Sequence, residues 1–124
     1  MTPSELRHRA TEILTGNILH FWMEKMKDGL NGGFFGQMTG KGEINPTADK
    51  GAILCGRRLW AFSSAYRIIG DPEYLRFASV AKDYLRRNFY DHEQGGVFWA
   101  LDYRGKHVDS KKQFYALGFA IYGL

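Results

Sequence analysis

One apolar segment constrains this chain more than any other feature. Residues 50–70 read KGAILCGRRLWAFSSAYRIIG, which predicts one long helix with apolar residues on nearly every side. A helix without a solvated face must be surrounded by other protein, yet this one carries Arg57 and Arg58 side by side near its middle. A buried cation is costly unless it is paired or used. The segment therefore predicts an enclosed inner helix whose buried cation has a specific role, whereas Arg58 is expected to form an ion pair or to extend its charged end towards water.

Two amphipathic helices flank this segment. Thr2-Pro3-Ser4-Glu5 is a capping box with proline in the first turn, and the helical period then continues to about Lys27. Asp71-Pro72-Glu73 is a second start signal, for a helix that reaches about Phe89. Both helices alternate apolar and charged residues at helical spacing, so each is expected to have one wet face.

A glycine pair and a short hairpin follow each amphipathic helix. Residues 34–38 and 43–45 predict the first hairpin, and residues 97–102 and 107–108 predict the second. An apolar helix comes next in both cases. Thr47 or Asp49 is the expected cap of the first of these helices, and Asp109 or Ser110 is the expected cap of the second, which is apolar from residue 114 to residue 124.

The order of elements repeats. Gly32-Gly33 matches Gly95-Gly96 at an offset of 63 residues, and Lys50 and Gly56 match Lys112 and Gly118 at an offset of 62. We therefore expect two units, residues 1–70 and 71–124, with the second truncated, because such repeats bury their faces by stacking on neighbours. Alternating outer amphipathic and inner apolar helices favour a closed ring of helical hairpins. Small residues in both apolar helices would let the inner helices approach closely.

Composition narrows the classes of function. The chain has 124 residues and a formal net charge of +4, but its basic residues are scattered in ones and twos, so no nucleic-acid footprint is expected. Cys55 is the one cysteine and cannot form an intrachain disulfide or a metal site by itself. No segment has the length and apolarity of a membrane span or of a secretory leader. These features fit a reducing cytoplasm.

Three motifs carry a resemblance to a known family. They are ADKGAIL-x-x-R-x-LW-x-F, GGV-[FY]-W and KKQ-x-Y-x-x-x-FAIYG, and together they extend over nearly the whole chain. The sequence closely resembles the N-terminal third of the cellobiose 2-epimerases, in the N-acylglucosamine 2-epimerase superfamily. The resemblance implies an all-α (α/α)6 barrel, here represented by two helical hairpins with short β-hairpins. It also implies a cofactor-independent enzyme that inverts C2 of the reducing-end sugar of β-1,4-linked disaccharides through a cis-enediolate.

The resemblance also implies two substrate-binding residues. The arginine of the first motif falls on Arg57 and the tyrosine of KKQ-x-Y on Tyr115. The repeat supports this pairing, because Phe119 corresponds to Arg57 at an offset of 62 and positions four apart share a helix face. Arg57 and Tyr115 should therefore lie on one stripe of successive inner helices. A fixed guanidinium there could stabilise the negative charge of an enediolate.

No catalytic residue is assigned within this chain. The family's general acid and base histidines lie on later hairpins, beyond Leu124, and none of His8, His20, His92 and His107 falls in a matching motif. The 124 residues alone are therefore expected to be inactive. Their uncovered inner-helix surface would favour poor solubility or self-association.

Other interpretations stay open at this point. A compact four-helix bundle would need unusually long connections. Within the superfamily, an epimerase acting on N-acyl-D-glucosamine is the neighbouring function. Asp102 and Asp109 could suggest glycoside hydrolysis, although aspartates at such positions usually serve turns and caps. A noncatalytic carbohydrate-binding remnant of a truncated gene is the alternative from another class.

Overall fold

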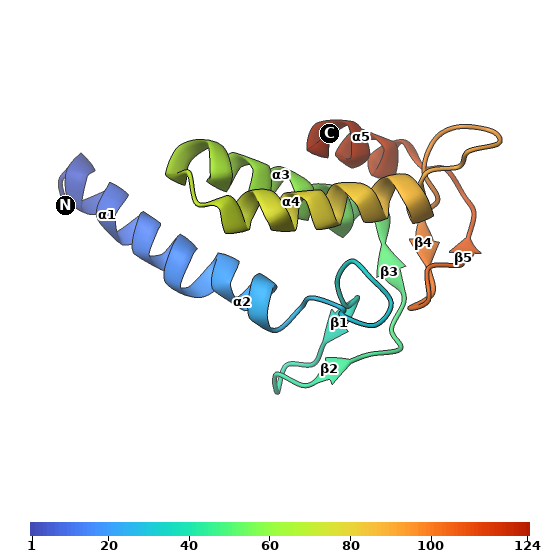
Figure 1. The fold of residues 1–124 in the computed structure, drawn as a ribbon, viewed down its shortest axis with the longest axis horizontal. Coiled ribbons are helices and arrows are strands. Elements are labelled where there is room, and N and C mark those ends of the chain that lie inside the picture. Colours follow the sequence, from blue (N-terminus) through green and yellow to red (C-terminus); the bar gives the residue numbers. More distant parts are fainter.

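Four helices and five short strands make up the computed structural model, which describes all 124 residues. The N-terminal helix is continuous (Figure 1), although a π-helical turn divides it into three parts. The third helix ends in a π-helical turn. The helical segments are α1 (Pro3–Ile13), η1 (Leu14–Leu19), α2 (His20–Glu24), α3 (Ala52–Ile69), α4 (Pro72–Tyr84), η2 (Leu85–Phe89) and α5 (Phe114–Gly123).

The amphipathic helices begin where the sequence predicts. Thr2 accepts a hydrogen bond from the backbone N–H of Glu5, and the Glu5 carboxylate accepts one from the Thr2 N–H, which completes the capping box. Asp71 caps α4 through the N–H of Glu73. Gly70 ends α3 in the left-handed conformation with φ of 84°.

The two apolar helices begin at other residues than the sequence predicts, and without the predicted caps. Lys50 and Gly51 form strand β3 (Lys50–Gly51) instead of the first turn of the helix, and α3 begins after Gly51 without a side-chain cap. The last helix begins after Gln113, also without one. Thr47, Asp49, Asp109 and Ser110 are therefore not caps. The cause is tertiary, because β3 pairs with a strand of the second hairpin and so keeps residues 50–51 extended.

Two small antiparallel sheets form beside the helices. One is the predicted hairpin of β1 (Gln37–Met38) and β2 (Ile44–Asn45). The other joins β3 to the second hairpin in the order β3-β4-β5, with β4 at Ala100–Leu101 and β5 at His107–Asp109. This second sheet links the two repeats, because Lys50 pairs with Leu101.

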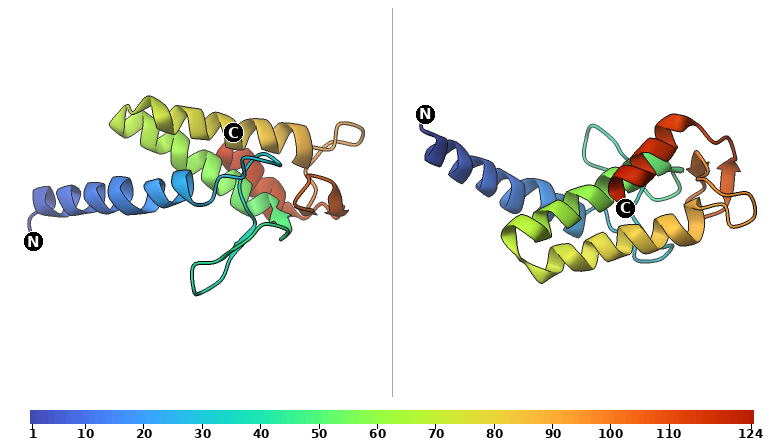
Figure 2. Two further views of the ribbon diagram at one scale, coloured as in Figure 1. Left: turned by 60° about the horizontal axis from the view of Figure 1, so that its bottom comes forward. Right: turned by 90° about the horizontal axis from the view of Figure 1, so that it is seen from above.

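Helix α3 packs along α4 and crosses α5 (Figure 2). The crossing is so close that a Cβ on Gly56 would collide with the carbonyl oxygen of Phe119, and a Cβ on Gly123 would collide with the carbonyl oxygen of Gly56. The expected role of small residues is thus confirmed at Gly56 and Gly123. Gly118, which corresponds to Gly56 in the repeat, has no atom within 4 Å of a Cβ built on it.

The two apolar helices keep part of their surface uncovered, as the sequence predicts for these 124 residues. Seven residues of α3 are buried, but Trp60 and Ile68 are 42% and 80% exposed. Only Ala116, Ala120 and Gly123 are buried in α5, while Phe114 is 91% exposed. Within these 124 residues, each of the two helices is covered on some sides and exposed on the others. No helix has both the length and the apolar character that crossing a membrane requires.

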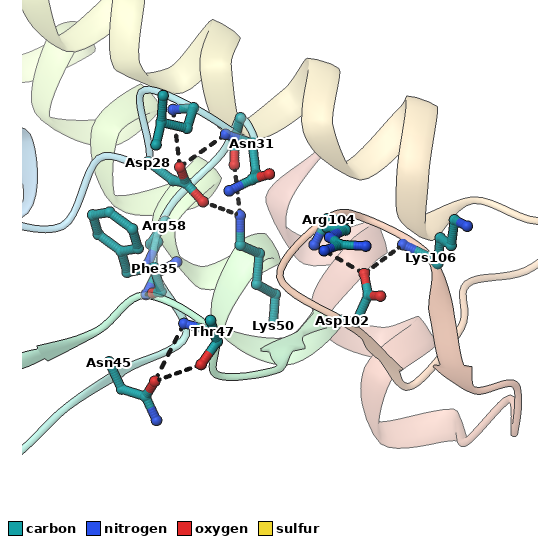
Figure 3. A network of polar contacts seen from close by, with 12 residues as sticks. Asp28, Asn31, Phe35, Asn45, Thr47, Lys50, Arg58, Asp102, Arg104 and Lys106 are labelled. Carbon is teal, nitrogen blue, oxygen red and sulfur yellow. Dashed lines mark hydrogen bonds and ion pairs between the residues drawn. The ribbon is translucent and has the colours of Figure 1, made fainter.

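A buried ion pair holds the first loop to the start of α3 (Figure 3). The Lys50 ammonium donates to Asp28 at 2.7 Å and to the carbonyl oxygen of Gly32 at 2.8 Å, and the two charged side chains are only 5% and 0% exposed. Burial by itself would raise the pKa of Asp28, but the N–H of Asn31 and the Lys50 ammonium outweigh burial and lower it. The carboxylate therefore stays ionised and bound.

The same arrangement recurs in the second repeat. Lys112 donates to Asp91, which also accepts backbone hydrogen bonds from Glu93 and Gln94. These hydrogen bonds, with that of Lys112 as the largest contribution, lower the pKa of Asp91 to about 2. This pair is more exposed, at 26% for Lys112 and 12% for Asp91.

Tyr84 explains the difference in burial between the two pairs. Its ring lies 5.0 Å from the Lys50 ammonium and covers the first loop so closely that a Cβ on Gly33 would come within 2.8 Å of it. Gly33 also has φ of 65°, which favours glycine. A residue of the second repeat thus covers the ion pair of the first.

Replacing Gly56 with alanine should destabilise the protein. The added Cβ meets backbone atoms of α5, which cannot rotate away, so α3 and α5 must separate at a cost of about 1–3 kcal/mol. The free energy of unfolding, measured by urea titration, checks this expectation. Gly16→Ala is the matched control, because a Cβ there meets nothing within 4 Å and alanine should be neutral or stabilising by about 0.5–1 kcal/mol. Equal stabilities of the two variants would contradict the close contact.

The two repeat-related ion pairs should differ in their sensitivity to substitution. Lys50→Met leaves the Asp28 carboxylate buried without its cation and should destabilise by about 3–5 kcal/mol. Lys112→Met leaves Asp91 close to water and with its backbone hydrogen bonds from Glu93 and Gln94, so it should destabilise the protein much less. Urea midpoints of the two variants give the comparison. A larger loss for Lys112→Met would show that Tyr84 does not control the strength of these pairs.

Candidate functional site

A pocket of about 460 Å³ opens between α3 and α5. Arg57, Trp60 and Ala61 line it from α3, and Tyr115, Phe119 and Tyr122 line it from α5. The α5 residues follow the spacing i, i+4 and i+7, which places them on one helix face. The pocket exists because the crossing at Gly56 brings that face beside the Arg57 face of α3. It therefore combines one cation with several aromatic rings.

Arg57 is the one charged group that lines this pocket. Its guanidinium carbon lies 5.6 Å from the centroid of the Phe119 ring, and its side chain forms neither an ion pair nor a hydrogen bond with any residue of the chain. The expectation that Arg57 is enclosed by apolar residues is wrong within these 124 residues, because its side chain is exposed. Its guanidinium is therefore available to an anionic or polar ligand.

Tyr115 is 63% exposed at the start of α5. Its ring meets the Phe119 ring edge to face, with centroids 5.2 Å apart and planes at 79°. The structure thus brings both predicted substrate-binding residues, Arg57 and Tyr115, to one pocket on neighbouring helices. Their role in binding a sugar stays a prediction.

Tyr122 and the part that Phe119 plays at this pocket were not predicted from the sequence. Tyr122 stacks on Trp60 with centroids 5.1 Å apart and contacts the edge of Phe119 at 6.0 Å. A signal was present, because residues 115, 119 and 122 share one helix face. In a helix that is apolar on nearly every side, periodicity does not distinguish aromatic residues that line a pocket from those of the core.

Arg58, and not Arg57, is the buried arginine. Its guanidinium carbon lies 4.3 Å from the Trp22 ring centroid and 4.8 Å from that of Phe34, and its Nη2 donates to the carbonyl oxygen of Phe35 at 3.2 Å. Burial lowers the pKa of Arg58 to about 10. No carboxylate pairs with it, so the aromatic rings and one carbonyl group hold this charge. Arg58 therefore fastens α2 and the first loop to α3.

None of the four histidines lines the pocket between α3 and α5. His8 pairs with Glu12 on α1, His92 bonds to the carbonyl oxygen of Arg86, and the His107 ring stacks on Phe98. His20 is exposed at the start of α2. Proton transfer at this pocket by a histidine of this chain is therefore not supported.

Asp102 serves the turn of the second hairpin, and Asp109 serves the segment that follows β5. Asp102 accepts hydrogen bonds from the backbone N–H groups of Arg104 and Lys106 (Figure 3), and Asp109 accepts one from the N–H of Lys111. The bond from Lys106 is the largest contribution to the lowered pKa of Asp102. These carboxylates thus have the local role expected of turn residues. The chain has no group of three or more histidine, cysteine or acidic side chains placed to hold a metal ion.

Comparison with known proteins gives consistent matches. The family model described as N-acylglucosamine 2-epimerase matches residues 33–124. Cellobiose 2-epimerase of Bacteroides fragilis is 56% identical over 119 residues, which is 96% of this chain and 30% of that protein. Cellobiose 2-epimerase of Ruminococcus albus is 42% identical over 124 residues, which is 100% of this chain and 31% of that protein.

The fold agrees with these matches. The structure of cellobiose 2-epimerase from Bacillus thermoamylovorans B4167 superposes with a TM-score of 0.94 at 36% identity, and covers 97% of this chain and 31% of that one. These neighbours are (α/α)6 barrels, so the predicted fold class is confirmed. The chain spans about 30% of the length of the relatives that it matches. The family match over residues 33–124, the identity of these relatives and the shared fold show that the chain belongs to the N-acylglucosamine 2-epimerase family.

Proposed function

We propose that the intact protein carrying this chain is a sugar 2-epimerase that inverts C2 of the reducing-end sugar of β-1,4-linked disaccharides such as cellobiose. The relatives at 56% and 42% identity are both cellobiose 2-epimerases, which supports this substrate class. In the proposal, residues 1–124 form the first part of one (α/α)6-barrel catalytic domain. Arg57 and Tyr115 bind the sugar.

The pocket between α3 and α5 is the observation that carries the proposal. Inversion at C2 requires a proton to leave that carbon and another to be delivered to its opposite face, and the intermediate is an enediolate with negative charge on oxygen. A guanidinium fixed in place before the reaction can stabilise charge that develops only in the transition state. Arg57 has no internal carboxylate partner, so its full hydrogen-bonding capacity remains for the sugar oxygens.

Tyr115 would supply a different kind of contact. Its exposed ring offers an apolar face to the sugar ring, and its hydroxyl group can donate to or accept from a sugar hydroxyl. Together, the Arg57 cation would stabilise the negative charge of the enediolate, and the Tyr115 ring would orient the reducing end of the sugar. The two proton-transferring groups would come from other parts of the intact protein, because none of the histidines here lines the pocket.

An N-acyl-D-glucosamine 2-epimerase is the second candidate, because the matching family model carries that description. Both reactions invert C2 next to a carbonyl group, and the pocket residues named here would serve either. A competition assay separates them: the intact protein is supplied with equal concentrations of cellobiose and N-acetyl-D-glucosamine. We expect the glucosyl-mannose product to dominate, and a dominant N-acetyl-D-mannosamine product would favour the second candidate.

Arg57→Ala in the intact protein should lower kcat on cellobiose by roughly 10²–10³-fold, as expected for loss of one oxyanion-stabilising group. Incorporation of deuterium at C2 in D₂O, followed by NMR, reports the proton-transfer step directly. Arg67→Ala is the matched control, because Arg67 is an exposed arginine near the end of the same helix and lines none of the pocket. An Arg57→Ala enzyme that retains its kcat would remove Arg57 from the mechanism.

A further inference from the structure

Phe119 lies at the centre of the candidate site. Its half-buried ring contacts three pocket residues: the Arg57 guanidinium at 5.6 Å, the Tyr115 ring at 5.2 Å and the Tyr122 ring at 6.0 Å. Both aromatic contacts are edge to face, at 79° and 84°. Phe119 is thus in contact with both predicted substrate-binding residues.

The backbone of Phe119 is fixed by the helix crossing. Its carbonyl oxygen is the atom that a Cβ on Gly56 would meet, and Gly56 is the neighbour of Arg57 in the chain. Any change in the spacing of α3 and α5 would therefore move the ring relative to the guanidinium. The packed backbone fixes the position from which the Phe119 side chain extends, and edge-to-face contacts with Tyr115 and Tyr122 limit the orientations of its ring.

Arg57, by contrast, has little else to hold its side chain. It is exposed and forms no ion pair or hydrogen bond within the chain, so several rotamers of its long side chain would be open to it. An aromatic face attracts a guanidinium placed over it and thereby restricts those rotamers. Arg58 makes the same kind of cation–π contact in a buried position, since two aromatic rings hold its guanidinium.

We propose that Phe119 is a positioning residue, which holds the Arg57 guanidinium and the Tyr115 ring in the orientation that binds the reducing end of the sugar. This inference rests on the proposed function of the pocket. Phe119 acts through Arg57 and Tyr115 and takes no proton itself. Its contribution is to reduce the freedom of the two side chains before the sugar binds.

A double-mutant cycle in the intact protein tests the proposal. Phe119→Leu keeps an apolar side chain but removes the aromatic face, and it should lower kcat by roughly 3- to 30-fold, the range expected for loss of one cation–π contact. Phe119→Tyr keeps the face and should restore most of the rate. In an Arg57→Ala background, Phe119→Leu should have a smaller effect on kcat, because one of the two groups that it positions is gone and only its contact with Tyr115 remains.

Phe77→Leu is the control for general loss of packing. Phe77 is 2% exposed in the core beside Arg76 and lies outside the pocket, so its replacement should lower the melting temperature without lowering kcat below that temperature. A structural role alone for Phe119 would make Phe119→Leu behave like Phe77→Leu.

A spectroscopic readout makes the test independent of activity. With isotope-labelled arginine, the side-chain resonances of Arg57 should show the ring-current shift of a group over an aromatic face, and Phe119→Leu should abolish this shift. Unchanged Arg57 resonances in Phe119→Leu, or an equal loss of kcat with and without Arg57, would overturn the positioning role. Wild-type kcat in Arg57→Ala would instead overturn the proposed function, while the ring-current result would still decide whether Phe119 holds Arg57.

Discussion

The backbone contact of α3 with α5 at Gly56 is the constraint on which the rest of the structure depends. Because a Cβ at Gly56 or Gly123 would collide with a carbonyl group of the facing helix, only glycine permits this spacing at either position. The contact places the Arg57 face of one helix beside the aromatic face of the other. The candidate site is therefore a consequence of how closely two backbones approach, before any polar interaction is counted.

The glycine-pair loops also show that one repeat depends on contacts with the next. Each repeat ties its glycine-pair loop to the start of an apolar helix through an aspartate and a lysine, Asp28 with Lys50 and Asp91 with Lys112. The chemistry is the same, but the first pair is buried because Tyr84 of the second repeat covers it. In a stacked repeat architecture each repeat contacts its neighbours, so the second repeat can bury the Asp28–Lys50 ion pair of the first.

Two adjacent arginines have opposite surroundings for a geometric reason. Successive residues of a helix point about 100° apart, so Arg57 and Arg58 cannot face the same neighbours. Rings from α2 and the first loop enclose Arg58, whose charge then has a structural use. Arg57 faces the open pocket beside α5 and keeps its hydrogen-bonding groups free. Arg58 is thus the buried cation whose charge has a structural reason, while the role proposed for Arg57 rests on its place in the pocket.

Much of the local structure follows from the sequence alone, because its signals act over a few residues. The capping box at Thr2, the Asp71-Pro72 start and the glycine-pair loops depend on backbone hydrogen bonds and on glycine conformation, so they could be read without coordinates. The repeat and the shared face of Arg57 and Tyr115 also follow from spacing. Tertiary structure alone decided that Lys50 lies in a strand, that Arg58 is the enclosed arginine and that Phe119 contacts both predicted site residues. Each of these depends on partners far away in the chain, which residue spacing does not specify.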